Sequence, residues 1–243
     1  MPQAAFSQGG AVVYTAMYGD YDTLKPQPVQ DVPCDFICFT DKKDLADPSG
    51  CWHIILAPQP PVHPRMQAKY FKLMSHRVFP DGQLAPRYDW PGRRKTYDFV
   101  VWTDASIRIF SSAFVREICG DVGENKWAMP PHPQRDCIYR EASYSTHLAK
   151  YKDQPLEEQA ASYRAAGHPE HWGLWACGLI ARSGQLPEKV KALGEAWWEE
   201  NLRWSYQDQV SLPYLLRRHH VGVDIIPRSL SDGFGVYSHK RDN

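Results

Sequence analysis

One acidic residue stands between two apolar runs of the sequence, where a charge is costly. In FVVWTDASIRIF (99–110), four apolar residues and a threonine precede Asp104, and apolar residues alternate after it. Burying a lone carboxylate is strongly unfavourable unless the group is paired or bound to a cation. Asp104 is therefore predicted either to be held by local hydrogen bonds or to lie at the mouth of a site.

The chemistry open to Asp104 depends on the oxygen donors near it. A divalent cation held by carboxylate oxygens can neutralise a diphosphate leaving group. A second acid two residues further on would strengthen such a site, but Ser106, a weaker ligand, occupies that position. Asp104 is thus a candidate ligand for Mn²⁺ or Mg²⁺, and a hydrogen-bonded strand end is the equal alternative.

Positive charge for the same purpose is available in MQAKYFKLMSHRVF (66–79). Apolar residues recur there at helical spacing, and Lys69, Lys72 and His76 share a neighbouring, more polar face. Cationic side chains can stabilise a departing diphosphate without a metal. The alternative is a helix face that is simply solvated.

A second acid, Asp208, lies next to Gln209 in WSYQDQVSLPYLL (204–216). If Ser205 were an N-cap, Asp208 three residues later would complete a capping box. Pro213 argues against that, because it would fall inside the same helix and disrupt it. Asp208 is therefore also a candidate for a base or for a group that binds the acceptor.

Several other common catalytic sites lack support in this sequence. The segment HPQRDCIYREA (132–142) contains a histidine and a cysteine, but no second ligand pair has zinc spacing. His219 and His220 are adjacent, so on a helix they diverge by about 100° and cannot chelate together. No P-loop, G-x-G-x-x-G or nucleophile elbow is present. Zinc, hydrolase and dinucleotide functions are therefore disfavoured.

The elements that must position these side chains alternate between strands and helices. Apolar runs bounded by turn residues predict strands, and longer runs with helical periodicity predict helices. The predicted strands are 11–19, 34–41, 52–58, 99–110, 174–182 and 223–230. The predicted helices are 66–79, 111–122, 155–167 and 186–204. Strands that are apolar on both faces are typical of an α/β fold with a mainly parallel central sheet flanked by helices.

Polar residues follow three of these strands. Gly19 comes after the first, Thr40 and Asp41 end the second, and Asp104 follows the apolar run FVVW. In parallel α/β sheets, ligands bind beyond the carboxyl ends of the strands. The sequence therefore predicts that these residues share one rim of the sheet and that the site lies there.

Bulk properties restrict the class of protein further. The 243 residues predict a single domain, 1–243, with a core at about 11–226 and a polar tail at 229–243. Equal numbers of basic and acidic side chains, 28 each, argue against a general nucleic-acid-binding surface. No apolar run could span a membrane, and no signal peptide is recognisable. Six scattered cysteines favour free thiols, so a cytoplasmic protein is expected.

The motifs, taken in order, resemble one family. They are VVYTAMYGDYDTLK, CDFICFTD, KYFKLMSHRVFP, FVVWTDASIRI, HPQRDCIYREA, EEQAASYRAAG, GLIAR and YQDQVSLPYLL. Over about residues 11–226 the chain resembles a glycosyltransferase-like family, formerly a domain of unknown function, whose plant members include hexosyltransferases of the mucilage-related type. The family resembles GT-A glycosyltransferases. The resemblance therefore implies a single GT-A-like domain that binds a nucleotide sugar.

The resemblance also implies roles for individual residues. The nucleoside would be cradled by residues of two strand ends: Tyr14, Thr15, Tyr18, Asp22, Thr40 and Asp41. The phosphates would lie near one helix, at Lys69, Lys72 and His76. Asp104 would be the counterpart of the D-x-D metal motif, and Asp208 and Gln209 would match an R-D-Q-x-S segment near the sugar. Gln207 stands here in place of that arginine.

The expected function is transfer of a hexose from a nucleoside diphosphate sugar to an acceptor that the sequence does not identify. A nucleotidyltransferase would also use a strand-end acid with a cation, but it normally needs two or three clustered acids. A catalytically inactive nucleotide-sugar-binding module is the third hypothesis, because nine tryptophans and thirteen tyrosines could supply stacking surfaces.

Overall fold

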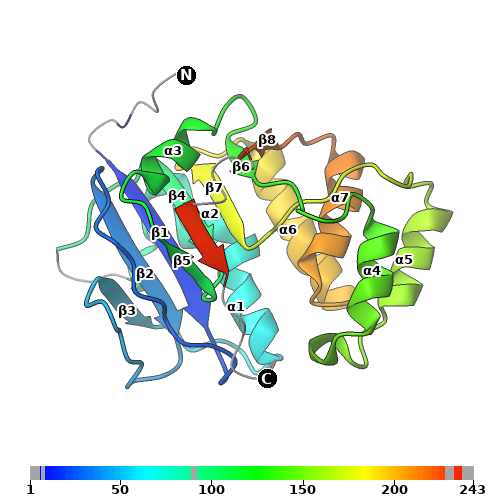
Figure 1. The fold of residues 1–243 in the computed structure, drawn as a ribbon, viewed down its shortest axis with the longest axis horizontal. Coiled ribbons are helices and arrows are strands. Elements are labelled where there is room, and N and C mark those ends of the chain that lie inside the picture. The colour runs from blue at the N-terminus through cyan, green and yellow to red at the C-terminus, as the bar shows by residue number, and fades with distance from the viewer. Residues whose placement is uncertain (1–5, 7–8, 89–91, 228–232, 237–243) are drawn as a thin grey trace.

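The centre of the molecule is a seven-stranded sheet in the order β3-β2-β1-β4-β7-β6-β8. The computed structural model describes residue 6 and residues 9–88, 92–227 and 233–236. The sheet strands are β1 (Ala11–Met17), β2 (Cys34–Thr40), β3 (Trp52–Leu56), β4 (Phe99–Thr103), β6 (Trp127–Met129), β7 (Leu179–Ser183) and β8 (Asp224–Ile225). β1 to β4 run parallel, and β7 is antiparallel to both β4 and β6 (Figure 1). The predicted α/β fold with a mainly parallel sheet is confirmed.

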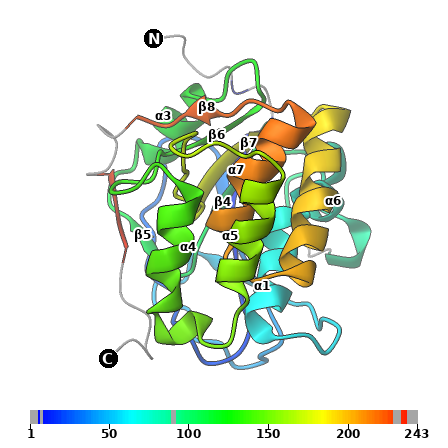
Figure 2. The same ribbon diagram turned by 90° about the vertical axis from the view of Figure 1, so that its right-hand side faces the viewer.

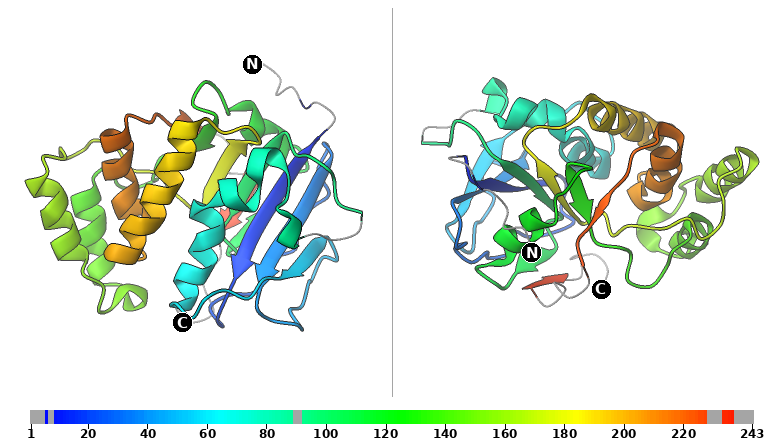
Figure 3. Two further views of the ribbon diagram at one scale, coloured as in Figure 1. Left: turned by 180° about the vertical axis from the view of Figure 1, so that it is seen from behind. Right: turned by 90° about the horizontal axis from the view of Figure 1, so that it is seen from above.

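Helices cover both faces of this sheet. The helices are α1 (Pro64–Leu73), α2 (Ser75–Val78), α3 (Phe114–Gly120), α4 (Ile138–Thr146), α5 (Leu156–Ala165), α6 (Glu188–Arg203) and α7 (Asp208–His219). α1, α2 and α6 lie on one face, seen from behind in Figure 3, and α3 lies on the other. α4, α5 and α7 stand side by side at one end of the sheet (Figure 2) and share their own buried cluster.

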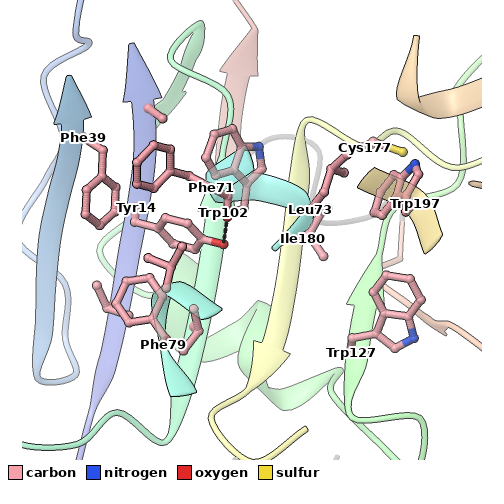
Figure 4. Packing of buried hydrophobic residues seen from close by; sticks show 14 of the residues in the cluster. Tyr14, Phe39, Phe71, Leu73, Phe79, Trp102, Trp127, Cys177, Ile180 and Trp197 are labelled. Carbon is pink, nitrogen blue, oxygen red and sulfur yellow. Dashed lines mark hydrogen bonds between the residues drawn. The ribbon is translucent and has the colours of Figure 1, made fainter. Parts of the chain in front are cut away.

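Both faces of the parallel strands are buried, which explains their continuous apolar sequences. Along β1, Tyr14 packs towards α1 and α2, while its neighbour Val13 packs towards α3. The Tyr14 ring meets Phe39, Phe79 and Trp102 edge-on, with ring centroids 4.9 to 6.3 Å apart (Figure 4). Edge-to-face contacts of this kind stabilise an aromatic core beyond the area that they bury.

The alternation predicted one strand over 99–110, and this prediction is wrong. β4 ends at Thr103, and the Asp104 carbonyl accepts a hydrogen bond from the Ile107 amide (2.9 Å), which closes a turn. The chain then forms β5 (Ile107–Ile109), which pairs with β9 (Phe234–Val236) in a separate two-stranded sheet. Asp104 therefore occupies a turn that follows a strand, which accounts for an acid between two apolar runs.

Other element boundaries also differ from the prediction. The predicted helix 66–79 is divided into α1 and α2, with Met74 between them in a non-helical conformation. In 174–182 only the part from Leu179 is strand, and α3 is shorter than 111–122.

The C-terminal region departs from the prediction as well. Of the predicted strand 223–230, only Asp224–Ile225 is strand, and 228–230 lies outside the described residues. The predicted tail contains β9.

Helix α7 corrects the capping prediction around Asp208. The helix begins at Asp208 with Gln207 as its N-cap, and no side chain caps it. Ser205 instead donates its hydroxyl hydrogen to Gln159 Oε1 (2.6 Å). The helix continues through Pro213 to a basic last turn, which complements the helix dipole together with Asp208 at the first turn.

Candidate active site

A cavity of about 370 Å³ opens beyond the carboxyl ends of β1 and β4. Its walls come from the segment after β1, from one side of α1, from the turn at Asp104 and from the start of α7. Gly19 and Asp104 both line it, so two of the three predicted strand ends meet at this cavity, whereas Thr40 and Asp41 of the third lie outside its lining.

Four charged side chains form a connected cluster in the wall of this cavity. Asp208 Oδ2 lies 2.5 Å from Lys72 Nζ and 3.0 Å from Lys69 Nζ. Lys72 Nζ also lies 3.4 Å from Asp104 Oδ1, so it links the two carboxylates. α1 positions both lysines, because side chains three residues apart on a helix project from the same face.

Burial distinguishes the two acids. The Asp208 side chain is only 5 % exposed and the Lys72 side chain 3 %, whereas the Asp104 side chain is 40 % exposed. Asp208 is thus enclosed beneath the lysines, and Asp104 reaches the open space of the cavity. The lysine face predicted to be polar is therefore a buried ion-pair surface and not a solvated one.

The cluster shifts the acid–base equilibria of its members. Burial alone would raise the pKa of Asp208, but the charges of Lys69 and Lys72 lower it well below its ordinary value. Burial lowers the pKa of Lys72, yet Asp104 and Asp208 together raise it above its ordinary value. For Lys69, burial outweighs its attraction to the shared Asp208, and its pKa is lowered. Asp208 is consequently held as a carboxylate and is a poor proton acceptor.

We expect acid to destabilise the fold through Asp208. The pKa of Asp208 in the folded protein lies below its ordinary value of 3.8. Its ion pairs therefore stabilise the fold fully above about pH 3.8, and this stabilisation is lost as the pH falls towards the folded-state pKa. The free energy of unfolding, measured in urea, should therefore decrease below about pH 4, and less steeply in Asp208→Asn. The same acid dependence in both proteins would contradict this prediction.

Asp104 is oriented by its neighbours in sequence and in space. Its Oδ1 accepts a hydrogen bond from Trp102 Nε1 (2.8 Å), and its backbone amide donates to the Gly178 carbonyl (2.8 Å). A Cβ atom at Gly178 would lie 3.2 Å from Asp104 Oδ2, so the glycine leaves room for this oxygen. Trp102 and Lys72 therefore both contact Asp104 Oδ1, and neither of them contacts Asp104 Oδ2.

The residues predicted to bind the donor divide into two groups. Those that line the cavity are Tyr18, Asp22, Lys69, Lys72, Asp104, Asp208 and Gln209. Those that lie outside its lining are Tyr14, Thr15, Thr40, Asp41 and His76.

Each member of the second group has a different environment. Tyr14 is buried, and its hydroxyl donates to the Phe71 carbonyl at 3.1 Å. Thr15 is fully buried within β1, and Thr40 donates its hydroxyl hydrogen to the Met17 carbonyl at 2.8 Å, which ties β2 to β1. Asp41 is exposed beyond β2, and His76 pairs with Glu195 of α6 at 2.7 Å. These five residues therefore lie outside the cavity in which we propose that the donor binds.

Several cavity residues were not predicted. His132, Tyr151 and Gln207 line the cavity, and Gln207 directly precedes Asp208 in the chain. The Tyr151 hydroxyl donates to Gln207 Oε1 (2.9 Å), and Gln207 Nε2 donates to the buried Glu141 (2.8 Å). Arg135 pairs with the same carboxylate at 2.5 Å. This network holds Gln207, the residue that precedes Asp208, in position. Its partners are far apart in the sequence, so no local sequence pattern could predict it.

Aromatic and cationic side chains border the cavity. The guanidinium of Arg65 lies 4.4 Å from the centre of the Tyr21 ring, and both residues line the cavity. Tyr206, another lining residue, stacks on His63 with ring centroids 4.8 Å apart. Lys150 adds a further positive charge. This border is suited to a ligand that carries both a flat ring and negative charge.

The donor atoms do not fit a preformed site for a divalent cation. In the part of the chain that the structure describes, no three His, Cys, Asp or Glu side chains are grouped to hold a metal. Asp104 Oδ1 and Asp208 Oδ2 are taken by lysines, and Ser106 is buried. Mg²⁺ in proteins is commonly held by one or two carboxylates together with water and the phosphate oxygens of a bound ligand, so this wall alone does not form a complete cation site.

A mostly parallel α/β sheet with a charged cavity at the carboxyl ends of its strands is the arrangement in which open α/β proteins commonly bind ligands. More specifically, the chain belongs to the TOD1/MUCI70, glycosyltransferase-like domain family, which it matches over residues 3–225. A comparison with curated proteins found no match. The matched region contains every cavity residue except Val236, which belongs to β9. Among the described helices, none has the length and apolar character needed to cross a membrane.

Proposed function

We propose that the protein transfers a hexose from a nucleoside diphosphate sugar to an acceptor hydroxyl. The observation that carries this proposal is the Lys69–Asp208–Lys72–Asp104 cluster, which opens into a cavity at the carboxyl edge of the sheet in a glycosyltransferase-like domain. The cavity joins positive charge for a diphosphate to an exposed carboxylate that can accept a hydrogen bond from a ribose or sugar hydroxyl.

The reaction needs these two features at different points. The bond between the anomeric carbon and the diphosphate oxygen breaks, and its electron pair leaves with the diphosphate. An acceptor oxygen forms the new bond to the anomeric carbon and releases its proton to a base or to water. Negative charge therefore grows on the leaving diphosphate, where Lys69 and Lys72 would stabilise it.

Asp208 takes a positioning role in this proposal and not that of a base. Its carboxylate holds both ammonium groups at the wall of the cavity, and their charges lower its pKa. Asp104, being more exposed, is the acid that would contact the donor. A nucleotidyltransferase is less well supported, because it normally needs two or three clustered acids that can hold a cation. This cluster contains Asp104 and Asp208, and Asp208 is paired with both lysines.

A panel of nucleoside diphosphate sugars tests the proposal directly. The purified protein is incubated with UDP-, GDP- and ADP-hexoses, with and without simple sugar acceptors, and release of nucleoside diphosphate is followed by chromatography. We expect turnover or slow hydrolysis with at least one donor. Tight binding of a donor without any turnover would instead support an inactive nucleotide-sugar-binding module.

Gly178→Ala should slow turnover without unfolding the protein. The added Cβ would meet Asp104 Oδ2 at 3.2 Å and Ile107 Cδ1 at 3.4 Å, so the carboxylate must shift by a few tenths of an ångström. We expect kcat to fall about threefold to tenfold. Thermal denaturation serves as the control for folding. Unchanged kcat in a folded variant would show that the position of Asp104 is not critical.

A further inference from the structure

The geometry points to a diphosphate site that works without a metal ion, in which the paired lysines of α1 supply the charge that a divalent cation would otherwise bring. This inference rests on the proposed function, and it identifies the groups that neutralise the charge of the leaving diphosphate. It concerns three residues, Lys69, Lys72 and Asp208, whose side chains are all buried or nearly so.

The lysines already contact one oxygen of each carboxylate. Lys72 Nζ is 3.4 Å from Asp104 Oδ1, the oxygen that also accepts the Trp102 hydrogen bond. Both ammonium groups contact Asp208 Oδ2. A divalent ion bound to Asp104 would therefore lie close to the Lys72 ammonium, and the two positive charges would repel each other across a partly desolvated wall.

The buried part of the cluster carries more positive than negative charge. Two ammonium groups share one buried carboxylate, and the second acid, Asp104, is partly exposed and contacts only Lys72 of the pair. Lys69 lines the cavity with its side chain 15 % exposed, so a bound anion can reach it. A diphosphate placed there would complete the pairing of Lys69.

Lys72 is held in a fixed position in the wall of the cavity. Lys72 is 2 % exposed, and its Nζ lies 5.9 Å from the centre of the Trp102 ring in addition to its two carboxylate contacts. Its carbonyl accepts a hydrogen bond from the buried Arg182 (3.0 Å), which anchors this turn of α1 to β7. Charges fixed in position before the ligand arrives stabilise a developing anion without reorganisation.

Calorimetry of nucleoside diphosphates tests this inference. UDP, GDP, ADP and CDP are titrated into the full chain in excess EDTA and, separately, with Mn²⁺. We expect at least one to bind in EDTA, with Mn²⁺ changing its affinity by less than about threefold. Lys69→Met keeps much of the shape of the side chain but removes its charge. It should lower the affinity for the nucleotide that binds about tenfold to a hundredfold. Lys69→Arg should retain most of the affinity.

The matched control is Lys191→Met on α6, where the lysine pairs with Asp81 and Glu188 outside the cavity. Its nucleotide affinity should equal that of the unmodified chain. Binding that requires Mn²⁺, or full affinity in a folded Lys69→Met variant, would overturn the inference and leave the proposed function standing. Failure of all four nucleotides to bind under both conditions would contradict the proposed function itself.

Discussion

Replacing Asp208 with asparagine is expected to lower the free energy of unfolding by about 3 to 5 kcal/mol, because it leaves two lysines buried without their shared counter-ion. Asp208 Oδ2 contacts Lys72 at 2.5 Å and Lys69 at 3.0 Å, and the Lys72 side chain is 3 % exposed. The substitution also removes the acid from the first turn of α7, where the helix dipole favours a negative charge.

Urea denaturation at neutral pH measures this effect, and a double variant identifies its cause. Combining Asp208→Asn with Lys72→Met removes one buried ammonium group together with the acid. If unpaired buried charge is the main cost, the double variant should regain about 1 to 2 kcal/mol relative to Asp208→Asn. A loss below about 1 kcal/mol in the single variant would mean that water reaches the lysines and that the cluster is not buried in solution.

The second large effect is expected at Asp104. Asp104→Asn keeps the shape of the side chain but removes the charge that faces the cavity, so hydrogen bonds from a donor hydroxyl would weaken. We expect turnover to fall at least about tenfold, which corresponds to about 1.4 kcal/mol of transition-state stabilisation. Initial rates with the best donor of the panel measure this.

Asp81→Asn is the matched control for that experiment. Asp81 is an exposed acid that pairs with Lys191, lies outside the cavity lining and has a positive φ of 48°, which asparagine tolerates well. Its turnover should be unchanged. Full activity in a folded Asp104→Asn variant would contradict this prediction and support the alternative, that Asp104 is only a hydrogen-bonded residue at a strand end.

The fold was predictable because its signals are local. Apolar runs bounded by turn residues located β1, β2, β3 and β4, and the rule that parallel strands present their carboxyl ends to ligands placed Gly19 and Asp104 at one cavity. The change of sheet after Asp104 was missed because apolar residues continue on both sides of it, and periodicity alone does not show where a chain leaves one sheet for another.

The environments of the candidate site residues were less predictable, because they depend on partners far along the chain. Spacing placed Lys69 and Lys72 on one helix face, but only the fold shows that Asp208 pairs with both of them. Tyr14 illustrates the opposite case. Both faces of β1 are buried, so alternation could not show that its ring points into the aromatic core and away from the cavity.

A crystal structure of the protein with a bound nucleoside diphosphate sugar would test the central claim most directly. We expect the diphosphate within hydrogen-bonding distance, about 3 Å, of Lys69 Nζ, with a sugar or ribose hydroxyl donating to Asp104. The ligand should occupy the cavity between α1 and the turn at Asp104. A nucleotide bound elsewhere on the protein, or bound in this cavity with its phosphates directed away from Lys69, would contradict the account.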